Sequence, residues 1–175
     1  MNNLSEEDAW MMPREAFEWI EEHIPIGSKV LEFGSGKGTE RLSHNYTLFS
    51  IEHNPEWIGR YNSNYIYAPI KLAPTDSSEQ GIGWYDIEII KQNLPDEDFA
   101  LIIIDGPPAS IGRSRILNHL WILGKSDYIL IDDLHRKEEY SLSQRIAKEC
   151  NLKCLHLFKE SKNVSERQFG IFVRN

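Results

Sequence analysis

The chain has 175 residues, enough for one well-buried core and too few for two ordinary domains. Apolar residues make up 41% of it and charged residues 26%, a balance typical of globular proteins rather than disordered or fibrous ones. The net charge of −8 argues against binding a nucleic-acid backbone through a broad basic face, because that affinity comes largely from Lys and Arg.

Residues 1–27 are predicted to form a helical segment. Ser5 and Asp8 have capping-box spacing, and apolar residues from Ala16 to Ile24 fall on one helical face. No basic region followed by an apolar core is visible at the start, and no apolar run approaches bilayer length, so we expect no secretory signal and a cytoplasmic location. Apolar side chains near the start either cover a substrate as a lid or pack in the core; they are Trp10, Met11 and Met12.

A buried strand at 30–33 leads directly into a glycine-rich turn. The turn consists of Gly34, Ser35, Gly36, Lys37 and Gly38. It differs from the dinucleotide fingerprint, whose third glycine comes three residues after the second, and from the phosphate loop, whose lysine follows the last glycine. Such glycines either let a nucleotide-like ligand approach the backbone or only turn the chain from strand to helix.

The second strand, at 48–51, ends at Glu52, which lies twenty positions beyond Glu32. Asn54 and Pro55 fit the N-cap and the first turn of a following helix. A third strand is expected at 65–70.

The second half of the chain continues the alternation of strands and helices. The continuous apolar run at 99–104 suits a central strand covered on both faces. The other expected elements are a loop at 74–83, helices at 87–94, 116–124 and 137–149, a strand at 128–131, a charged loop at 159–167 and a final antiparallel pair at 153–158 and 168–173.

Cys150 and Cys154 are close in the sequence, but no second Cys pair or suitably spaced His accompanies them. We expect buried thiols rather than a metal or redox site, because free Cys is among the most buried residue types.

Alternating strands and helices predict an α/β domain with a mostly parallel sheet. An acidic residue before G-x-G-x-G, with Glu52 at its interval, resembles the class I S-adenosylmethionine-dependent methyltransferases. The resemblance implies a single domain with a three-layer α/β/α Rossmann-like core over 28–175. It also implies seven strands in the order 3-2-1-4-5-7-6, with strand 7 antiparallel.

The resemblance also implies where the cofactor S-adenosylmethionine lies. Glu52 would accept hydrogen bonds from the ribose hydroxyls, because a carboxylate has several lone pairs, and His53 would flank the adenosine. Glu32 would lie near the methionine part, and Asp105 or Gly106 near its amino group. Trp84 either lies beside adenine or packs in the core. The implied cofactor site is Glu32, Gly34, Ser35, Gly36, Gly38, Glu52, His53, Trp84, Asp105 and Gly106.

Three carboxylates are expected to converge at the ends of the fourth and fifth strands; they are Asp105, Asp132 and Asp133. Like charges repel unless a cation or a proton relieves them, and hard divalent cations prefer such oxygens. This suggests a metal-assisted O-methyltransferase with Mg or Mn, in which Asp105 and His135 are the catalytic candidates. Alternatively, Asp133 caps the next helix and Asp132 is solvated or bonded to backbone.

Looser similarity connects the chain to small-molecule and sugar O-methyltransferases. The similarity to the small-molecule enzymes rests on the three carboxylates, and the similarity to sugar-directed enzymes rests on three segments, 51–57, 105–108 and 133–136. Arg113 and Arg115 either bind an acidic group of the substrate or are merely solvated. A small-molecule or sugar hydroxyl is therefore the expected acceptor. An aminopropyl-type transferase and a non-catalytic cofactor-binding module remain the alternatives.

Overall fold

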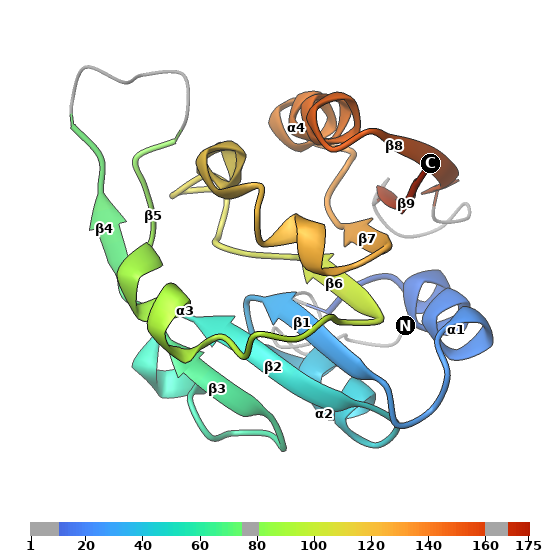
Figure 1. The fold of residues 1–175 in the computed structure, drawn as a ribbon, viewed down its shortest axis with the longest axis horizontal. Helices are drawn as coiled ribbons and strands as arrows, with labels where there is room; N and C mark the ends of the chain where they lie inside the picture. Colours follow the sequence, from blue (N-terminus) through green and yellow to red (C-terminus); the bar gives the residue numbers. More distant parts are fainter. Residues whose placement is uncertain (1–10, 75–80, 160–167) are drawn as a thin grey trace, which may run out of the picture.

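The computed structural model describes residues 11–74, 81–159 and 168–175. Its main sheet has seven strands in the order β3-β2-β1-β6-β7-β9-β8 (Figure 1). They are β1 (Lys29–Phe33), β2 (Thr47–Glu52), β3 (Asn64–Tyr67), β6 (Leu101–Ile104), β7 (Tyr128–Ile131), β8 (Leu152–Lys159) and β9 (Gln168–Arg174). The first five are parallel, and β9 runs antiparallel between β7 and β8. The predicted strand order is confirmed.

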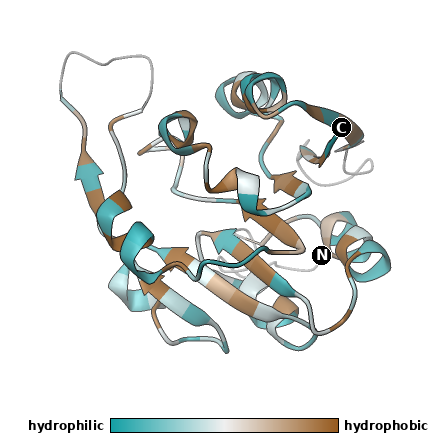
Figure 2. Cartoon of the chain, viewed as in Figure 1, coloured by the Kyte–Doolittle hydropathy of each residue, from teal (hydrophilic) through white to brown (hydrophobic). Residues whose placement is uncertain are grey.

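Helices cover both faces of this sheet. They are α1 (Arg14–His23), α2 (Lys37–Ser43), α3 (Ile87–Asn93) and α4 (Lys137–Glu149). Successive side chains of a strand point to opposite faces, so Leu101 and Ile103 share a cluster with α1 and α2, whereas Ile102 and Ile104 share one with α3 and α4. Figure 2 shows the apolar residues concentrated in the strands between these helices. The prediction of a central strand covered on both faces is confirmed.

Two predicted helices are instead short 3₁₀ turns. The side chain of Asn54 accepts a hydrogen bond from the amide of Glu56, as an N-cap should, but only the turn η2 (Pro55–Trp57) follows. The expected helix at 116–124 consists of η3 (Ser114–His119) and η4 (Leu123–Lys125). Ile116 is buried as expected, because a 3₁₀ turn also places residues three apart on one face.

The predicted third strand is divided. β3 ends at Tyr67, and β4 (Ile70–Leu72) pairs with β5 (Gly83–Tyr85) in a separate two-stranded antiparallel sheet. Pro69 lies at the break and has no amide hydrogen to donate to a ladder. The loop expected at 74–83 therefore ends before Gly83, and its residues 75–80 lie outside the described part of the chain.

The two cysteines are both free thiols. Cys150 is half-buried at the end of α4, but Cys154 is exposed on β8, an edge strand, so its expected burial is wrong. In the described ranges, no helix is both long and apolar enough to cross a membrane.

Candidate functional site

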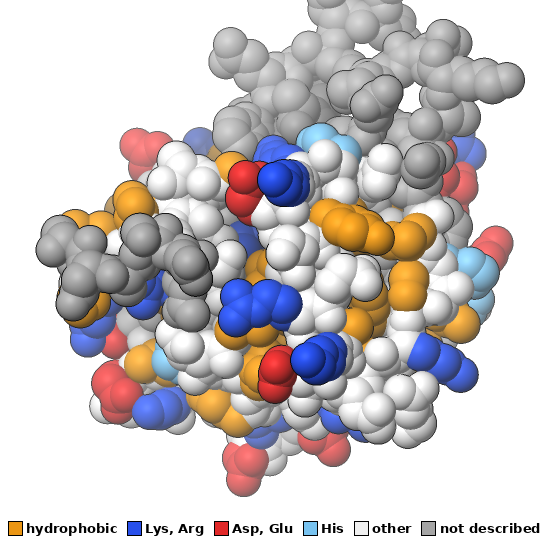
Figure 3. All heavy atoms as spheres, turned by 90° about the horizontal axis from the view of Figure 1, so that it is seen from above, with side chains coloured by type: hydrophobic (Ala, Val, Ile, Leu, Met, Phe, Trp, Pro, Cys, Tyr) orange, Lys and Arg blue, Asp and Glu red, His pale blue; other side chains and the backbone are white. Residues whose placement is uncertain are grey.

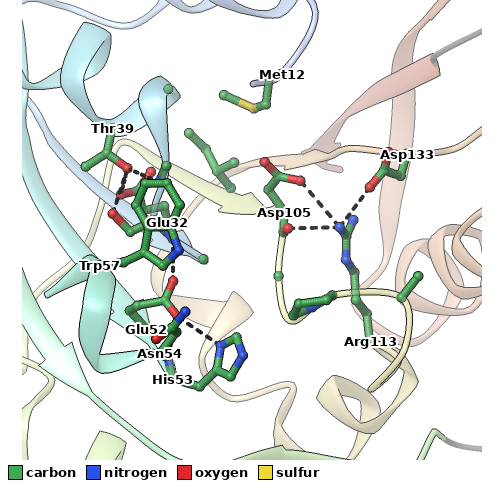
Figure 4. Close-up of a pocket in the computed structure, with 18 of the residues that line it drawn as sticks. Met12, Glu32, Thr39, Glu52, His53, Asn54, Trp57, Asp105, Arg113 and Asp133 are labelled. Carbon is green, nitrogen blue, oxygen red and sulfur yellow. Dashed lines mark hydrogen bonds and ion pairs between the residues drawn. The ribbon is translucent and has the colours of Figure 1, made fainter. Parts of the chain in front are cut away.

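A cavity of about 1010 Å³ opens at the carboxyl ends of β1, β2 and β6. In open parallel sheets, ligands bind where the strand order reverses, which here is between β1 and β6. Segments that are far apart in the sequence line it: the glycine turn, the end of β2, the loop after β6 and the loop after β7. Figure 4 shows the side chains of these segments facing one another across the cavity.

The glycine turn approaches the loop after β6 very closely. A Cβ atom on Gly34, whose φ is 90°, would lie 3.3 Å from the Cα atom of Gly106. At both positions a side chain would separate the loops. Gly38 also lines the cavity, but its Cα faces the ring of Phe17 in α1, where a Cβ would lie 3.3 Å from the ring. Gly34 and Gly106 thus bring the loops together, while Gly38 serves helix packing as well.

Glu52 is buried at the end of β2 and faces the glycine turn. Its Oε2 atom accepts the amide of Ser35 at 2.8 Å, and its Oε1 atom accepts the amides of His53 and Asn54 at 2.6 and 2.7 Å. The His53 Nδ1 atom lies 2.9 Å from Oε1. Burial raises the pKa of Glu52, but the hydrogen bonds from these groups outweigh burial and hold the pKa below its usual value. Glu52 is therefore a fixed carboxylate at the cavity wall.

Glu32, near the end of β1, accepts hydrogen bonds from hydroxyl groups rather than from backbone amides. Ser50 and Thr39 donate to its Oε1 atom at 2.5 and 2.7 Å. Burial raises the pKa of Glu32 to about 7, although these two hydroxyl groups oppose the shift. Thr39 also accepts the amide of Gly36 at 3.0 Å, so it connects the glycine turn to Glu32.

Arg113 is buried between two of the predicted carboxylates (Figure 4). Its Nη2 atom lies 2.8 Å from Asp133 Oδ2 and 3.3 Å from Asp105 Oδ1. Its guanidinium also donates to the backbone carbonyls of Asp105, Pro107 and Asp132. The expectation of a solvated Arg113 is thus wrong, because this side chain is buried and joins the ends of β6 and β7, whereas its contact with a substrate stays a prediction.

The three carboxylates do converge as predicted. Oxygen atoms of Asp105, Asp132 and Asp133 lie within 4.8 Å of one another, a separation at which they can share a metal ion. Arg113 supplies a cation at the same place, and Asp132 is fully buried behind the cavity wall. The metal site stays a prediction. An ion bound there would have to compete with the guanidinium of Arg113 for the carboxylates.

The loop after β7 carries the other predicted catalytic residue. His135 is exposed at the cavity rim, and Arg136 beside it places Nη1 2.8 Å from Asp133 Oδ2. Arg136 occupies the N-cap position of α4, so Asp133 does not cap that helix. Met12 lines the cavity and also belongs to the core cluster that contains α1, so it agrees with both alternatives, lid and core packing, whereas Trp10 lies outside the described residues.

Of the adjacent aromatic residues Trp84 and Tyr85, Tyr85 lines the cavity and the predicted Trp84 does not. Trp84 packs in the core against Phe33, with ring centroids 5.7 Å apart. Tyr85 is 1% exposed, and its hydroxyl has no hydrogen-bond partner among the described residues. A Cβ on Gly106 would lie 2.5 Å from that hydroxyl, so the hydroxyl points at the crevice between β1 and β6. Adjacent strand residues face opposite sides, and sequence alone does not tell which of the two aromatic residues faces the cavity.

Other residues of the site carried weak sequence signals. Thr39, three residues after Gly36, has the spacing of a capping side chain, which is its role here. Nothing in the sequence distinguished Arg113 from a solvated arginine. The lining residues not expected from the sequence include Thr39, Asn54, Trp57, Tyr85, Pro108, Ala109 and Ser110.

Neither a protein-family model nor a curated protein sequence matches this chain. Solved structures do. Magnesium protoporphyrin IX methyltransferase (ChlM) from Synechocystis PCC 6803, with bound SAM, is 9% identical and has a TM-score of 0.58, over 97% of this chain and 79% of its own. The N-methyltransferase NodS from Bradyrhizobium japonicum WM9 is 17% identical, with a TM-score of 0.56 over 92% and 95%. An rRNA methylase from Streptococcus thermophilus is 11% identical, with a TM-score of 0.57 over 91% and 94%.

The chain therefore has the fold of class I S-adenosylmethionine-dependent methyltransferases. These similar structures are named for a porphyrin, for N-methylation and for ribosomal RNA. Because one fold serves such different acceptors, the acceptor has to be inferred from the site.

Proposed function

We propose that this chain is an S-adenosylmethionine-dependent methyltransferase that acts on a hydroxyl group of a small molecule or a sugar. The observation that supports it most is that the glycine turn and Glu52, which sequence spacing connected with a nucleoside, line one cavity at the reversal of strand order. The buried hydroxyl of Tyr85 adds a polar group at this cavity whose partner is not among the described residues.

The residues present fit such a cofactor. In this proposal the Glu52 carboxylate holds the ribose hydroxyls, since its Oε2 atom accepts only one hydrogen bond from the described residues. Glu32 lies beside the methionine part, and the backbone at Gly34 and Gly106 approaches the ligand because neither residue has a side chain. His53 and Tyr85 place aromatic rings, with centroids 6.0 Å apart, on the adenosine side.

When bound, S-adenosylmethionine supplies an activated methyl group that an acceptor oxygen takes by in-line displacement, while the sulfur keeps the electron pair of the broken bond. The protein has to align the acceptor and remove its hydroxyl proton. We assign the role of the base that accepts this proton to His135, because His135 is exposed at the rim. The other candidate, Asp105, already accepts a hydrogen bond from Arg113. Arg113 keeps Asp105 and Asp133 in place at this rim.

A metal-assisted form of the reaction is the second version of this proposal. The close approach of Asp105, Asp132 and Asp133 favours it. In this version the ion would polarise the acceptor oxygen and would have to share the carboxylates with Arg113.

A small acceptor agrees with the surface charge. On the face shown in Figure 3, the basic side chains of the described residues are interspersed with acidic and apolar ones and form no continuous basic area. With a net charge of −8, this arrangement favours a small molecule over a nucleic-acid backbone.

Calorimetric titration with S-adenosylmethionine and S-adenosylhomocysteine tests the proposal. We expect both to bind, and failure of both would overturn it. An aminopropyl-type transferase would bind the decarboxylated form of S-adenosylmethionine more tightly than S-adenosylmethionine itself. A non-catalytic module would bind the cofactor but transfer no methyl group from radiolabelled S-adenosylmethionine to any acceptor offered.

A further inference from the structure

A second cavity, of about 340 Å³, adjoins the first. Ala109, Ser110, Arg113 and Arg136 line both cavities. This volume is at the lower end of the range for small-molecule sites. The second cavity thus lies directly beside the proposed cofactor site and has room for a small ligand.

Close backbone packing forms one wall of this second cavity. The amide of Ile82 donates to the carbonyl of Ile111 at 2.9 Å. A Cβ on Gly81, whose φ is 73°, would lie 2.5 Å from that same carbonyl oxygen and 3.2 Å from Gly112. The segment before β5 is therefore held against the loop after β6, and the cavity has a defined shape.

Glu139 in the first turn of α4 lines the opposite side. It is 4% exposed and no hydrogen bond or ion pair joins its carboxylate to another described residue, but its oxygen atoms are not among the fully buried ones that lack a partner, so they reach the cavity. Buried carboxylates are normally hydrogen-bonded, because desolvation penalises their charge. Burial lowers the pKa of Arg113, but the negative charges of the three aspartates, and after them that of Glu139, raise it. The net shift of the pKa is upward. Glu139 therefore offers acceptor sites to a ligand.

The charges around the second cavity are balanced. Arg113 and Arg136 face Glu138 and Glu139, two positive and two negative groups. Arg113 already donates to Asp105, Asp133 and backbone carbonyls, and Arg136 is paired with Asp133. A ligand here thus meets hydrogen-bond acceptors on Glu139, hydroxyls on Ser110 and Ser114, and apolar surface on Ile82 and Leu142.

We infer that this second cavity is the acceptor site, that it takes a neutral molecule with several hydroxyl groups, and that Glu139 accepts hydrogen bonds from those hydroxyls. The inference rests on the proposed function, because the adjoining cavity has to hold the methyl donor. Hydroxyl groups supply the donors that Glu139 lacks, and the apolar faces of a polyol ring match Ile82 and Leu142. The balanced charge gives no net preference for an anion or a cation.

Three sugars of similar shape and different charge test the inference: D-glucose, D-glucosamine and D-glucuronate. Each is titrated into the protein saturated with S-adenosylhomocysteine, while the amide NMR signals of Gly81, Gly112 and Leu142 are followed. We expect D-glucose to shift these signals, and the two charged sugars to bind at least about tenfold more weakly. The inference would be overturned if D-glucosamine bound more tightly than D-glucose, or if D-glucose did not shift these signals.

Two variants of α4 test the role of Glu139. Glu139→Leu should weaken D-glucose binding about tenfold or more, the range expected for a hydrogen bond to a charged group. Glu149→Leu removes the same charge from an exposed position in the last turn of the same helix and should leave binding unchanged. The affinity for S-adenosylhomocysteine shows whether each variant is folded. Equal D-glucose affinities of Glu139→Leu and the wild type would overturn the inference, whereas a wild type that binds no S-adenosylhomocysteine would overturn the proposed function itself.

Discussion

The amide nitrogen of Ser35 lies 2.8 Å from Oε2 of Glu52, which joins the glycine turn after β1 to the end of β2. The two sequence features that predicted a nucleoside site are thus directly bonded. The carboxylate fixes the turn and, in the proposed function, keeps a remaining lone pair for a ribose hydroxyl. One residue therefore fixes the shape of the loop and, in the proposed function, also binds the ligand.

Replacing Glu52 with Gln should weaken cofactor binding by at least about tenfold, because one oxygen then becomes a donor that faces the amide of Ser35. Unfolding in urea should also show a loss of about 1–3 kcal/mol. Affinity is measured by calorimetry with S-adenosylhomocysteine. The exposed Glu56→Gln, in the same loop, is the matched control. If Glu52→Gln bound as tightly as Glu56→Gln, the ribose assignment would be wrong.

Stability should depend on pH through Glu32. Its pKa is raised by burial from 4.5 to about 7, so between these pH values the folded protein holds a proton that the unfolded chain releases. This contribution is complete below about pH 4.5 and is lost as pH rises through about 7. Glu32→Gln lacks it. The free energy of unfolding of the wild type relative to Glu32→Gln should therefore fall by up to roughly 3 kcal/mol between pH 4.5 and pH 8. If the free energies of unfolding of the two proteins, measured in urea, changed in parallel with pH, this prediction would be wrong.

Tyr85→Phe should stabilise the ligand-free protein and weaken cofactor binding. The buried hydroxyl lacks a partner among the described residues, and removing such a group relieves a penalty of about 1–3 kcal/mol. Its pKa is raised well above the usual value by burial and by the charge of Glu52, so it is a neutral donor at neutral pH. Thermal unfolding and calorimetry measure the two effects. A lower melting temperature with unchanged affinity would mean that this hydroxyl does not serve the ligand.

Arg113 should make magnesium unnecessary for stability. Its guanidinium lies 2.8 Å from Asp133, where a divalent ion would otherwise balance the carboxylates. We expect MgCl₂ to raise the melting temperature of the wild type no more than NaCl of equal ionic strength does. Arg113→Met should lose about 3–5 kcal/mol, since it leaves buried charge uncompensated, and should regain part of it with MgCl₂. A magnesium-specific gain in the wild type would favour the metal-assisted reaction instead.

Most of the core strands and the helices α1, α3 and α4 followed from local patterns. The apolar run at 99–104 predicted a strand buried on both faces, and Leu101 to Ile104 are all buried. The pattern at 116–124 predicted burial of Ile116 correctly but not the 3₁₀ conformation, because residues three apart lie on one face in both helix types. The choice between Trp84 and Tyr85 depended on the pairing of β4 with β5, which no local pattern contains.

The sequence by itself determined the alternation of strands and helices, the glycine turn and the interval from Glu32 to Glu52, because these depend on residues close together in the chain. Only the tertiary structure decided what surrounds the carboxylates. Asp105 and Arg113 come from the loop after β6 and Asp133 from the loop after β7, and these two loops meet because β6 and β7 are parallel neighbours. A buried arginine and a solvated one look alike in a sequence, since burial is set by segments distant in the chain.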